Sequence, residues 1–226
     1  MASEEATAQA FVKELLAVAS PIGFKTVTMY VILDRVCKDR TREILENFAK
    51  SEPRLKVVWA PENKNVVDAY VRGYREALAG GSDWILEIDA GNSHRPEDLA
   101  QFFDKMADGY DCVFGSRFMR GGRMYNCGIK RVVISRGGTW LTNALLGTRL
   151  KDMTSGFEMF TRKTLEMVLD KGIRSRGPFF QTEIKFYCRG LKIIEVPIQY
   201  RGASHSIGQS ALSDSFSNLW RLRKEK

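Results

Sequence analysis

The chain alternates between two patterns of apolar and polar residues. Short apolar runs rich in β-branched and aromatic side chains predict strands, and they occur at residues 27–33, 55–59, 84–88, 111–114, 157–160 and 192–196. Between them, apolar residues recur every three or four positions, which predicts helices at residues 4–19, 44–48, 67–78, 102–106, 136–146, 165–169, 182–188 and 213–222. Strands that alternate with helical crossovers favour an α/β fold, with a mostly parallel sheet flanked by helices.

Two acidic residues stand at the ends of predicted strands. Asp34 follows the strand at 27–33, and Asp89 follows the strand at 84–88. Open α/β sheets bind ligands at the carboxyl ends of their strands, so both carboxylates are candidate ligand-binding groups. An Asp at a strand end also commonly caps the next turn. Asp39 has the same two interpretations, because it can cap the helix near 44–48.

Composition narrows the class of protein. The 226 residues are 44% hydrophobic and carry a formal net charge of +8, which is typical of a globular chain with a basic surface. The four cysteines are widely spaced and predict neither a zinc site nor a disulfide framework. No apolar run approaches the ~18 residues that span a bilayer. Nucleic acid is not an expected partner, because the basic segments lack interleaved aromatic residues and any recognised module.

Six sequence blocks occur in a recognisable order: VILDRVCKDRTREIL, EIDAGNSHRPEDL, GSRFMRGG, RVVISRGGTWLTNALLG, DMTSGFEMFTR and EVPIQY. The first resembles the nucleotide-binding strand and helix of family 2 glycosyltransferases. The second resembles their donor-metal loop, usually D-A-D followed by H-x-P-E. The other four are similar to blocks of the dolichyl-phosphate mannose synthase branch and its bacterial polyprenyl-phosphate relatives. The resemblance extends from Glu4 to about Leu212.

The resemblance implies a GT-A-like fold with a Rossmann-like nucleotide-binding half. It also implies transfer of a sugar from a nucleotide sugar, GDP-mannose or a UDP-sugar, to a polyprenyl phosphate at the cytosolic membrane face. Carried over position by position, the donor-binding residues are Asp34, Asp39, Ala90, Gly91, Ser93 and Arg201. Asp89 would bind Mg²⁺ or Mn²⁺, which prefers one or two carboxylates together with phosphate oxygens.

The same resemblance assigns the acceptor phosphate to Arg117, Arg131 and Ser135, which with Asp89 form the expected catalytic set. Arginine suits phosphate geometry, and a serine hydroxyl adds a donor. Asp152 and Glu183 are acids that also match the family pattern. Two roles are considered for them: orienting an arginine, or orienting the sugar hydroxyls.

The sequence departs from the family pattern at three places. Gly91 stands where the second carboxylate of D-x-D is expected, so Ser93 or Asn92 would have to supply a neutral oxygen, or the ion is dispensable. By the resemblance, Met1 starts at about the carboxyl end of the first core strand, so we expect that strand to be absent, either because the sequence is truncated or because another segment fills the gap. The closing R-x-x-G-x-S-K motif has Ala211 in place of lysine, for which Arg201 would have to substitute.

We expect a single GT-A domain over residues 1–212, followed by an amphipathic basic helix over residues 213–226 that contacts the membrane peripherally from the cytoplasm. Two alternative functions remain open. One is a family 2 transferase with a saccharide acceptor, used in cell-surface polysaccharide synthesis, which would need a carboxylate base. The other is a degenerate, non-catalytic module that binds sugar nucleotides, as the departures at Gly91 and Ala211 would suggest.

Overall fold

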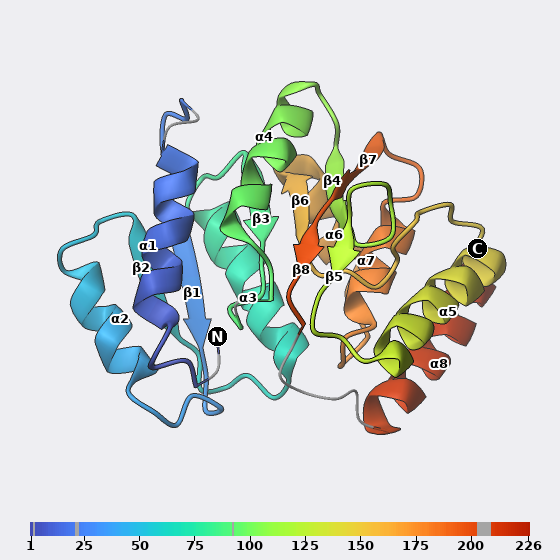
Figure 1. The fold of residues 1–226 in the computed structure, drawn as a ribbon, viewed down its shortest axis with the longest axis horizontal. Coiled ribbons are helices and arrows are strands. Elements are labelled where there is room, and N and C mark those ends of the chain that lie inside the picture. The colour runs from blue at the N-terminus through green and yellow to red at the C-terminus, as the bar shows by residue number, and fades with distance from the viewer. Residues whose placement is uncertain (2, 21–22, 92, 203–208) are drawn as a thin grey trace.

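Strands and helices alternate along the chain (Figure 1). The computed structural model describes residues 1, 3–20, 23–91, 93–202 and 209–226. In order, the elements are α1 (Ala8–Ala19), β1 (Met29–Leu33), α2 (Thr41–Ala49), β2 (Leu55–Trp59), α3 (Val66–Ala79), β3 (Trp84–Glu87), the short 3₁₀ turn η2 (Pro96–Asp98), α4 (Leu99–Ala107), β4 (Cys112–Ser116), β5 (Arg123–Met124), α5 (Ile129–Leu146), β6 (Glu158–Thr161), α6 (Arg162–Lys171), α7 (Phe180–Tyr187), β7 (Ile193–Pro197), β8 (Gln199–Tyr200) and α8 (Gln209–Lys224).

The strands form three groups. A four-stranded sheet has the order β3-β6-β4-β7, β1 pairs with β2, and β5 pairs with β8. The β1–β2, β4–β7 and β5–β8 pairs are parallel, whereas β6 runs antiparallel to both of its neighbours. The predicted α/β class with a mostly parallel sheet is therefore confirmed. The antiparallel placement of β6 is a tertiary feature that the apolar run at 157–160 did not indicate.

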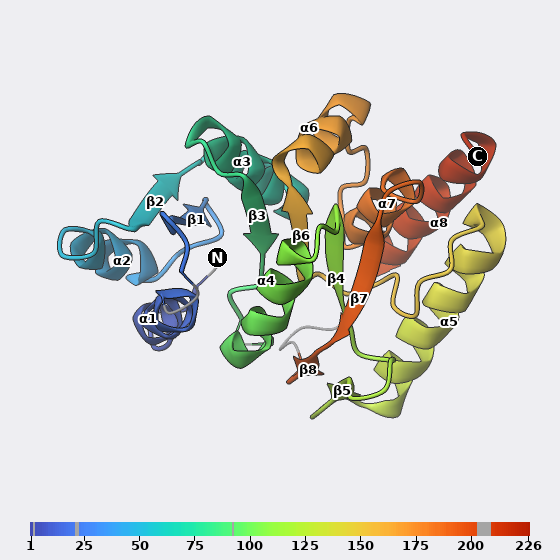
Figure 2. The same cartoon turned by 90° about the horizontal axis from the view of Figure 1, so that it is seen from above.

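The sheet is interrupted between β1 and β3. In the part of the chain that the structure describes, no strand pairs with the edge of β1 that faces away from β2. The amino nitrogen of Met1 donates a hydrogen bond to the Ile32 carbonyl on β1 at 2.8 Å. The start of the chain lies between β1 and β3 in the view from above (Figure 2).

Helices cover both faces of the sheet (Figure 2). On one side, α3, α6 and α7 contribute to the largest apolar cluster, which includes Phe114 and Phe160 from the strands. On the other side, α1 and α4 pack onto a second cluster around Phe102 and Phe157, whose rings stack with centroids 4.3 Å apart. Helices α5 and α8 pack together at one end of the molecule.

Two helix boundaries differ from the sequence prediction. Helix α5 begins at Ile129, seven residues before the predicted start at Arg136, because the glycines at 121–128 and at 137–138 obscure its apolar spacing. Helix α8 begins at Gln209, so the predicted tail helix starts inside it. Leu219 and Leu222 of α8 are buried, which anchors this helix to the rest of the fold.

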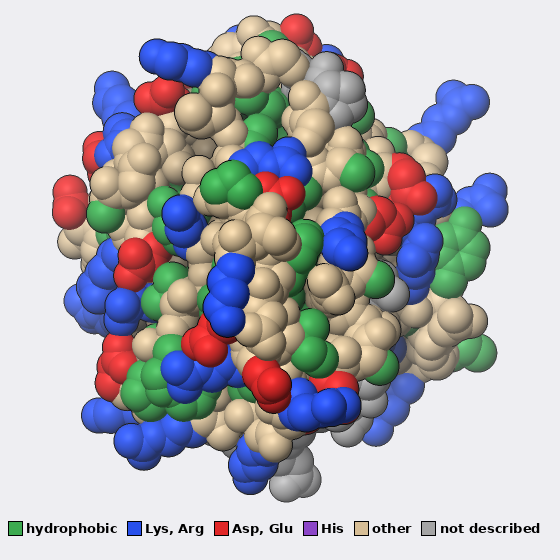
Figure 3. All heavy atoms as spheres, turned by 90° about the vertical axis from the view of Figure 1, so that its left-hand side faces the viewer, with side chains coloured by type: hydrophobic (Ala, Val, Ile, Leu, Met, Phe, Trp, Pro, Cys, Tyr) green, Lys and Arg blue, Asp and Glu red, His purple; other side chains and the backbone are tan. Residues whose placement is uncertain are grey.

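The net charge of +8 does not make every face of the molecule uniformly cationic. On the side of the molecule where α1 and α2 lie, Lys and Arg side chains are interspersed with Asp and Glu (Figure 3). Several of these form exposed ion pairs, such as Arg42 with Glu46 at 2.7 Å. This face is therefore mixed in charge and does not form a uniform cationic surface.

Candidate active site

The two acids predicted at strand ends follow β1 and β3. Asp34 follows β1, and its Oδ1 accepts a hydrogen bond from the Val36 amide at 2.9 Å. Asp89 lies two residues beyond the end of β3. Burial lowers the pKa of the Met1 amino group, while Asp34 and Asp89 both act on it in the opposite direction. Both carboxylates therefore favour the charged form of this amino group.

Asp89 accepts one side-chain hydrogen bond and lies near a second side chain. The Tyr70 hydroxyl on α3 donates a hydrogen bond to Asp89 Oδ1, and His94 Nε2 lies 3.8 Å from Asp89 Oδ2. Burial and the neighbouring carboxylate raise the pKa of Tyr70 well above its usual value, so Tyr70 stays a neutral donor. Asp89 itself keeps 44% of its side chain exposed. Tyr70 therefore orients Asp89, and the exposed part of the Asp89 carboxylate remains accessible to a ligand.

His94 supports this loop as a neutral side chain. Its ring lies between those of Phe157 and Tyr200, with centroids 5.0 and 5.4 Å away. Burial lowers the pKa of His94 to about 4, although Asp89 partly opposes this shift. At neutral pH the imidazole is thus uncharged, which favours a structural role over acid–base chemistry.

The rest of the donor loop is divided between surface and interior. Ala90 is half-buried and Gly91 is exposed, whereas Ser93 is buried and its carbonyl accepts a hydrogen bond from the Arg201 amide at 2.8 Å. His94 and Tyr200 form an antiparallel bridge beside this contact. The structure therefore brings Arg201 to the donor loop. Asn92 and residues 203–208 lie outside the described residues.

Asp39 has a local role in this structure. Its Oδ1 accepts a hydrogen bond from the Thr41 amide at 3.0 Å, at the start of α2. Its Oδ2 accepts one from the Glu5 amide at 2.9 Å. Both oxygens of Asp39 thus tie the N-terminal segment to the start of α2, although the N-cap residue of this helix is Arg40.

Arg117 forms a buried ion pair with Asp152. Its Nε and Nη2 donate to the two carboxylate oxygens at 2.7 and 2.8 Å, and its amide donates to Oδ2 at 3.0 Å. Burial opposes ionisation of Asp152, and Arg117 more than offsets this, so the pKa of Asp152 lies below its usual value. Asp152 therefore orients an arginine, one of the two roles considered for it.

Helix α7 holds the loop that carries Asp152. The Thr182 hydroxyl donates to the Met153 carbonyl at 2.9 Å, and Lys185 Nζ donates to the Ser155 carbonyl at 2.6 Å. Lys185 also pairs with Glu158, and both side chains are fully buried. Glu183, also on α7, instead pairs with Arg221 of α8, so it anchors the C-terminal helix and not the site.

Arg131 reaches the centre of the site from α5. Its Nη2 donates a hydrogen bond to the Tyr200 hydroxyl at 2.7 Å. The guanidinium carbons of Arg117 and Arg131 lie 5.3 and 5.5 Å from the centroid of the Tyr200 ring. Ser135 is buried one helical turn after Arg131, on the same face of α5. Tyr200 thus joins both predicted acceptor arginines to His94 of the donor loop.

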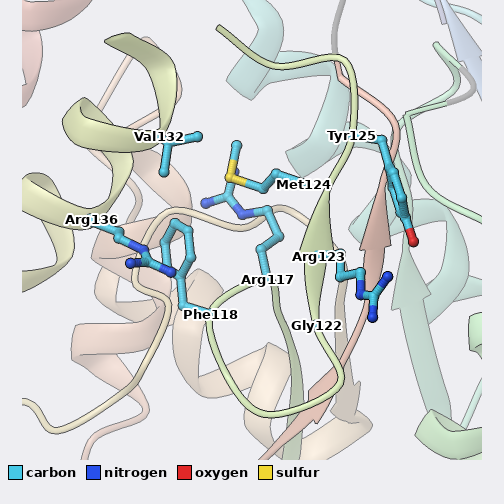
Figure 4. Close-up of a pocket in the computed structure, with 8 residues that line it drawn as sticks. All are labelled: Arg117, Phe118, Gly122, Arg123, Met124, Tyr125, Val132 and Arg136. Carbon is cyan, nitrogen blue, oxygen red and sulfur yellow. The ribbon is translucent and has the colours of Figure 1, made fainter. Parts of the chain in front are cut away.

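A hollow of about 260 Å³ adjoins this cluster, between α5 and the loop that follows β4 (Figure 4). Arginine and apolar side chains line it together: Arg117, Phe118, Arg123, Met124, Tyr125, Val132 and Arg136. The guanidinium carbons of Arg117 and Arg136 each lie 5.2 Å from the centroid of the Phe118 ring. The hollow therefore suits a ligand that combines phosphate with hydrocarbon.

Comparison with known proteins identifies the family. Residues 3–169 match the family described as Glycosyl transferase family 2. The chain belongs to glycosyl transferase family 2.

Two curated relatives resemble this family 2 glycosyltransferase over most of their length. The chain is 31% identical over 185 residues to "Undecaprenyl-phosphate mannosyltransferase" of Micrococcus luteus. This match covers 81% of the chain and 75% of the relative. The chain is 29% identical over 188 residues to "Polyprenol monophosphomannose synthase" of Mycolicibacterium smegmatis, covering 82% and 70%.

Solved structures support the fold. The glucosyl-3-phosphoglycerate synthase of Mycobacterium tuberculosis in complex with UDP superposes with a TM-score of 0.68 at 17% identity, covering 99% of this chain and 78% of that one. The same enzyme with Mn²⁺, UDP-glucose and phosphoglyceric acid gives 0.65 at 18% identity, covering 97% and 77%. The GT-A-like fold expected for this glycosyltransferase is confirmed.

Among the described residues of the donor loop, Asp89 is the one carboxylate that would hold a divalent cation. Neighbours of this fold have been crystallised with Mn²⁺, and Asp89 is the matching carboxylate. Tyr70 already occupies Asp89 Oδ1, Ser93 is buried, and Gly91 offers no oxygen from a side chain. Across the described ranges, no three His, Cys, Asp or Glu side chains lie together as metal ligands. No step of the reaction is therefore assigned to a metal ion.

Tyr200 and Tyr70 are site residues of this glycosyltransferase that sequence reasoning missed. Tyr200 closes the EVPIQY block and immediately precedes Arg201, and that adjacency was the one available signal. Tyr70 was placed by the sequence only within the predicted helix at residues 67–78. Its contact with Asp89 depends on how α3 packs beside β3, which apolar spacing does not reveal.

Proposed function

We propose that this family 2 glycosyltransferase transfers a sugar from a nucleotide sugar, GDP-mannose or a UDP-sugar, to the phosphate of a polyprenyl phosphate. The observation that carries the proposal is the Tyr200 cluster. It joins Arg117 and Arg131, beside a hollow of mixed arginine and apolar lining, to the loop that carries Asp89. The names of both curated relatives, which specify polyprenyl-type phosphates and mannose, support the same acceptor and sugar.

The chemistry of this acceptor matches the residues. The second ionisation of a phosphate monoester has a pKa of about 6, so the acceptor oxygen is already anionic at neutral pH. It needs orientation toward the anomeric carbon more than it needs a general base. Arg131 would bind the phosphate, with Ser135 adding a hydroxyl one turn away. Arg117 would also contact the phosphate, through the part of its guanidinium that lines the hollow. Asp152 fixes the orientation of that guanidinium.

A saccharide acceptor is less well supported. Its hydroxyl would require a carboxylate base. Asp152 is the acid adjoining the predicted acceptor arginines, and its two oxygens are bound to Arg117. The acceptor side therefore offers cations and apolar surface, which suit a lipid phosphate better than a sugar hydroxyl.

We further propose that helices α5 and α8 place this site at a membrane. Each carries an exposed apolar stripe at helical spacing: Ile129, Val133 and Trp140 on α5, and Leu212, Phe216 and Trp220 on α8. Basic residues lie on the same two helices, including Lys130 and Arg223, which suits anionic lipid headgroups. In the described part of the chain, no helix is both long and apolar enough to cross a bilayer. Peripheral contact at the cytosolic face is therefore the proposed arrangement.

Transfer from labelled nucleotide sugars to a polyprenyl phosphate in detergent tests the proposal. We expect a lipid-linked sugar from at least one donor, and we expect Arg131→Ala to weaken acceptor use much more than nucleotide binding. Arg149→Ala, which changes an exposed arginine after α5, is the matched control. Nucleotide binding without transfer from any donor would instead favour the non-catalytic interpretation.

A further inference from the structure

The loop between α5 and β6 binds Arg117 through two side chains. Residues 151–155 are named the Asp152 loop. Asp152 pairs with Arg117, and the Thr154 hydroxyl oxygen accepts a hydrogen bond from Arg117 Nη2 at 2.6 Å. The Thr154 amide in turn donates to Asp152 Oδ1 at 3.1 Å. The Asp152 loop therefore fixes the orientation of the Arg117 guanidinium with two of its side chains.

A glutamate on β7 fixes the start of this loop. Glu195 Oε2 accepts a hydrogen bond from the Lys151 amide at 2.7 Å, and Oε1 accepts one from the Asp152 amide at 2.9 Å. Glu195 is half-buried and lies opposite Phe114 in the parallel pair of β4 and β7. Arg117 directly follows β4. Glu195 thus ties the Asp152 loop to the strand pair from which Arg117 emerges.

Helix α5 is tied to the middle of the same loop. The Met153 amide donates a hydrogen bond to Thr139 Oγ1 at 3.2 Å, and Thr139 is buried. Residues 131, 135 and 139 are spaced four positions apart, so Arg131, Ser135 and Thr139 lie along one face of α5. The face of α5 that carries two predicted acceptor groups therefore also contacts the Asp152 loop.

The placement of α5 against β4 sets the distance between Arg117 and Arg131. The two arginines come from different elements, and a phosphate bound by both requires them to be held to within about 0.5 Å. The Asp152 loop contacts Arg117 with its side chains and Thr139 with its backbone. It therefore connects the two elements that carry the predicted acceptor arginines.

We infer that Thr139 and Glu195 are positioning residues for the acceptor phosphate. They hold the Asp152 loop from two sides and thereby set the distance between Arg117 and Arg131. The inference rests on the proposed function, because it takes a lipid phosphate as the ligand of these arginines. Neither positioning residue contacts the phosphate in this arrangement, so their loss should weaken acceptor binding and leave the donor side unchanged.

Thr139→Val tests the inference, because it replaces the hydroxyl by a methyl group and leaves the Met153 amide without its acceptor. We expect the affinity for farnesyl phosphate, measured by calorimetry, to fall about fivefold, as for loss of one hydrogen bond. Thr139→Ser keeps the hydroxyl and should bind farnesyl phosphate as the unmodified protein does. Affinity for UDP or GDP should stay the same in both variants.

Thr142→Val is the matched control. Thr142 is also buried on α5, and its hydroxyl donates to the Gly138 carbonyl of the same helix at 2.7 Å. The change in volume and polarity is the same as in Thr139→Val, but the hydroxyl removed has its bond within α5. Thr142→Val should therefore leave the affinity for farnesyl phosphate unchanged.

Glu195→Gln acts on the loop from the other side. It leaves one side-chain oxygen for two amides, those of Lys151 and Asp152, so we again expect weaker binding of farnesyl phosphate and unchanged binding of UDP or GDP. In transfer assays, the KM for polyprenyl phosphate should rise in Glu195→Gln and in Thr139→Val while kcat changes little, as for loss of acceptor binding alone.

The outcomes separate the inference from the proposed function. Equal affinities for farnesyl phosphate in Thr139→Val and Thr142→Val would overturn the inference and leave the proposed acceptor standing. Parallel losses of farnesyl phosphate and nucleotide binding would also overturn it, because they indicate a general disturbance of the fold. If the unmodified protein binds UDP or GDP but not farnesyl phosphate, the proposed acceptor fails and the inference fails with it.

Discussion

The Arg131 guanidinium donates a hydrogen bond from Nη2 to the Tyr200 hydroxyl at 2.7 Å. This contact links α5 to the short strand β8. The ring of Tyr200 also contacts the ring of His94 in the donor loop. The proposed donor and acceptor sides of the site therefore meet at Tyr200. Its hydroxyl and its ring have separable roles.

Tyr200→Phe removes the hydroxyl and keeps the ring. We expect the KM for polyprenyl phosphate to rise about fivefold, as for loss of a hydrogen bond of roughly 1 kcal/mol, because Arg131 loses its orientation. Affinity for UDP or GDP, measured by calorimetry, should not change. An equal loss in both quantities would contradict a specific role in positioning Arg131.

The Arg117–Asp152 pair is expected to contribute to stability as well as to function. Arg117→Ala leaves a buried carboxylate unpaired, which typically costs about 3–5 kcal/mol in the free energy of unfolding. Lys105→Ala breaks the ion pair with Asp108, in which the two side chains are 40% and 55% exposed. It should lower the free energy of unfolding by less than about 1 kcal/mol. Urea denaturation measures both.

A double variant separates the two roles of this pair. Arg117→Met with Asp152→Leu removes both buried charges, so we expect stability much closer to that of the unmodified protein than Arg117→Ala gives. Transfer to polyprenyl phosphate should still be lost. A stable double variant that retains transfer would show that Arg117 does not contact the acceptor.

His94 is expected to make stability fall in mild acid. Burial lowers its folded pKa to about 4 from a usual 6.5. Between these values the unfolded chain takes up a proton that the folded protein excludes, so stability decreases as pH falls from about 6.5 to about 4. His94→Phe preserves the ring contacts with Phe157 and Tyr200 and removes this titration.

The difference between these two proteins isolates the His94 contribution from all other titrating groups. On going from pH 7 to about 4.5, the unmodified protein should lose roughly 2 kcal/mol relative to His94→Phe. Chemical denaturation across this range provides the measurement. Parallel stability profiles would mean that His94 takes up its proton in the folded state.

The exposed stripes on α5 and α8 predict binding to anionic vesicles. Trp140→Asp and Phe216→Asp each place a charge where an aromatic ring, 72% or 55% exposed, would enter the interface. We expect each to weaken flotation with phosphatidylglycerol vesicles about tenfold, on the scale of burying one large apolar side chain. Leu191→Asp, in the turn after α7, is the control because that side chain is exposed away from both stripes. Equal losses in all three variants would contradict the assignment of this surface.

The sequence by itself determined the local elements and placed an acid after each of two predicted strands. Strand runs such as 55–59 and 84–88 agree with β2 and β3 to within one residue. Asp34 and Asp89 follow β1 and β3, as the apolar runs at 27–33 and 84–88 predict. These features follow from the period of apolar residues, which a short window of sequence contains.

Tertiary structure decided which side chains meet within the site. Arg117 pairs with Asp152, 35 positions away, and Arg131 with Tyr200, 69 positions away. The insertion of β6 between β3 and β4 likewise depends on contacts between distant segments. Local patterns of apolar and polar residues fix helices, strands and the faces they bury. They do not specify which buried or half-buried polar groups become partners, because those pairings form only when separate elements pack against one another.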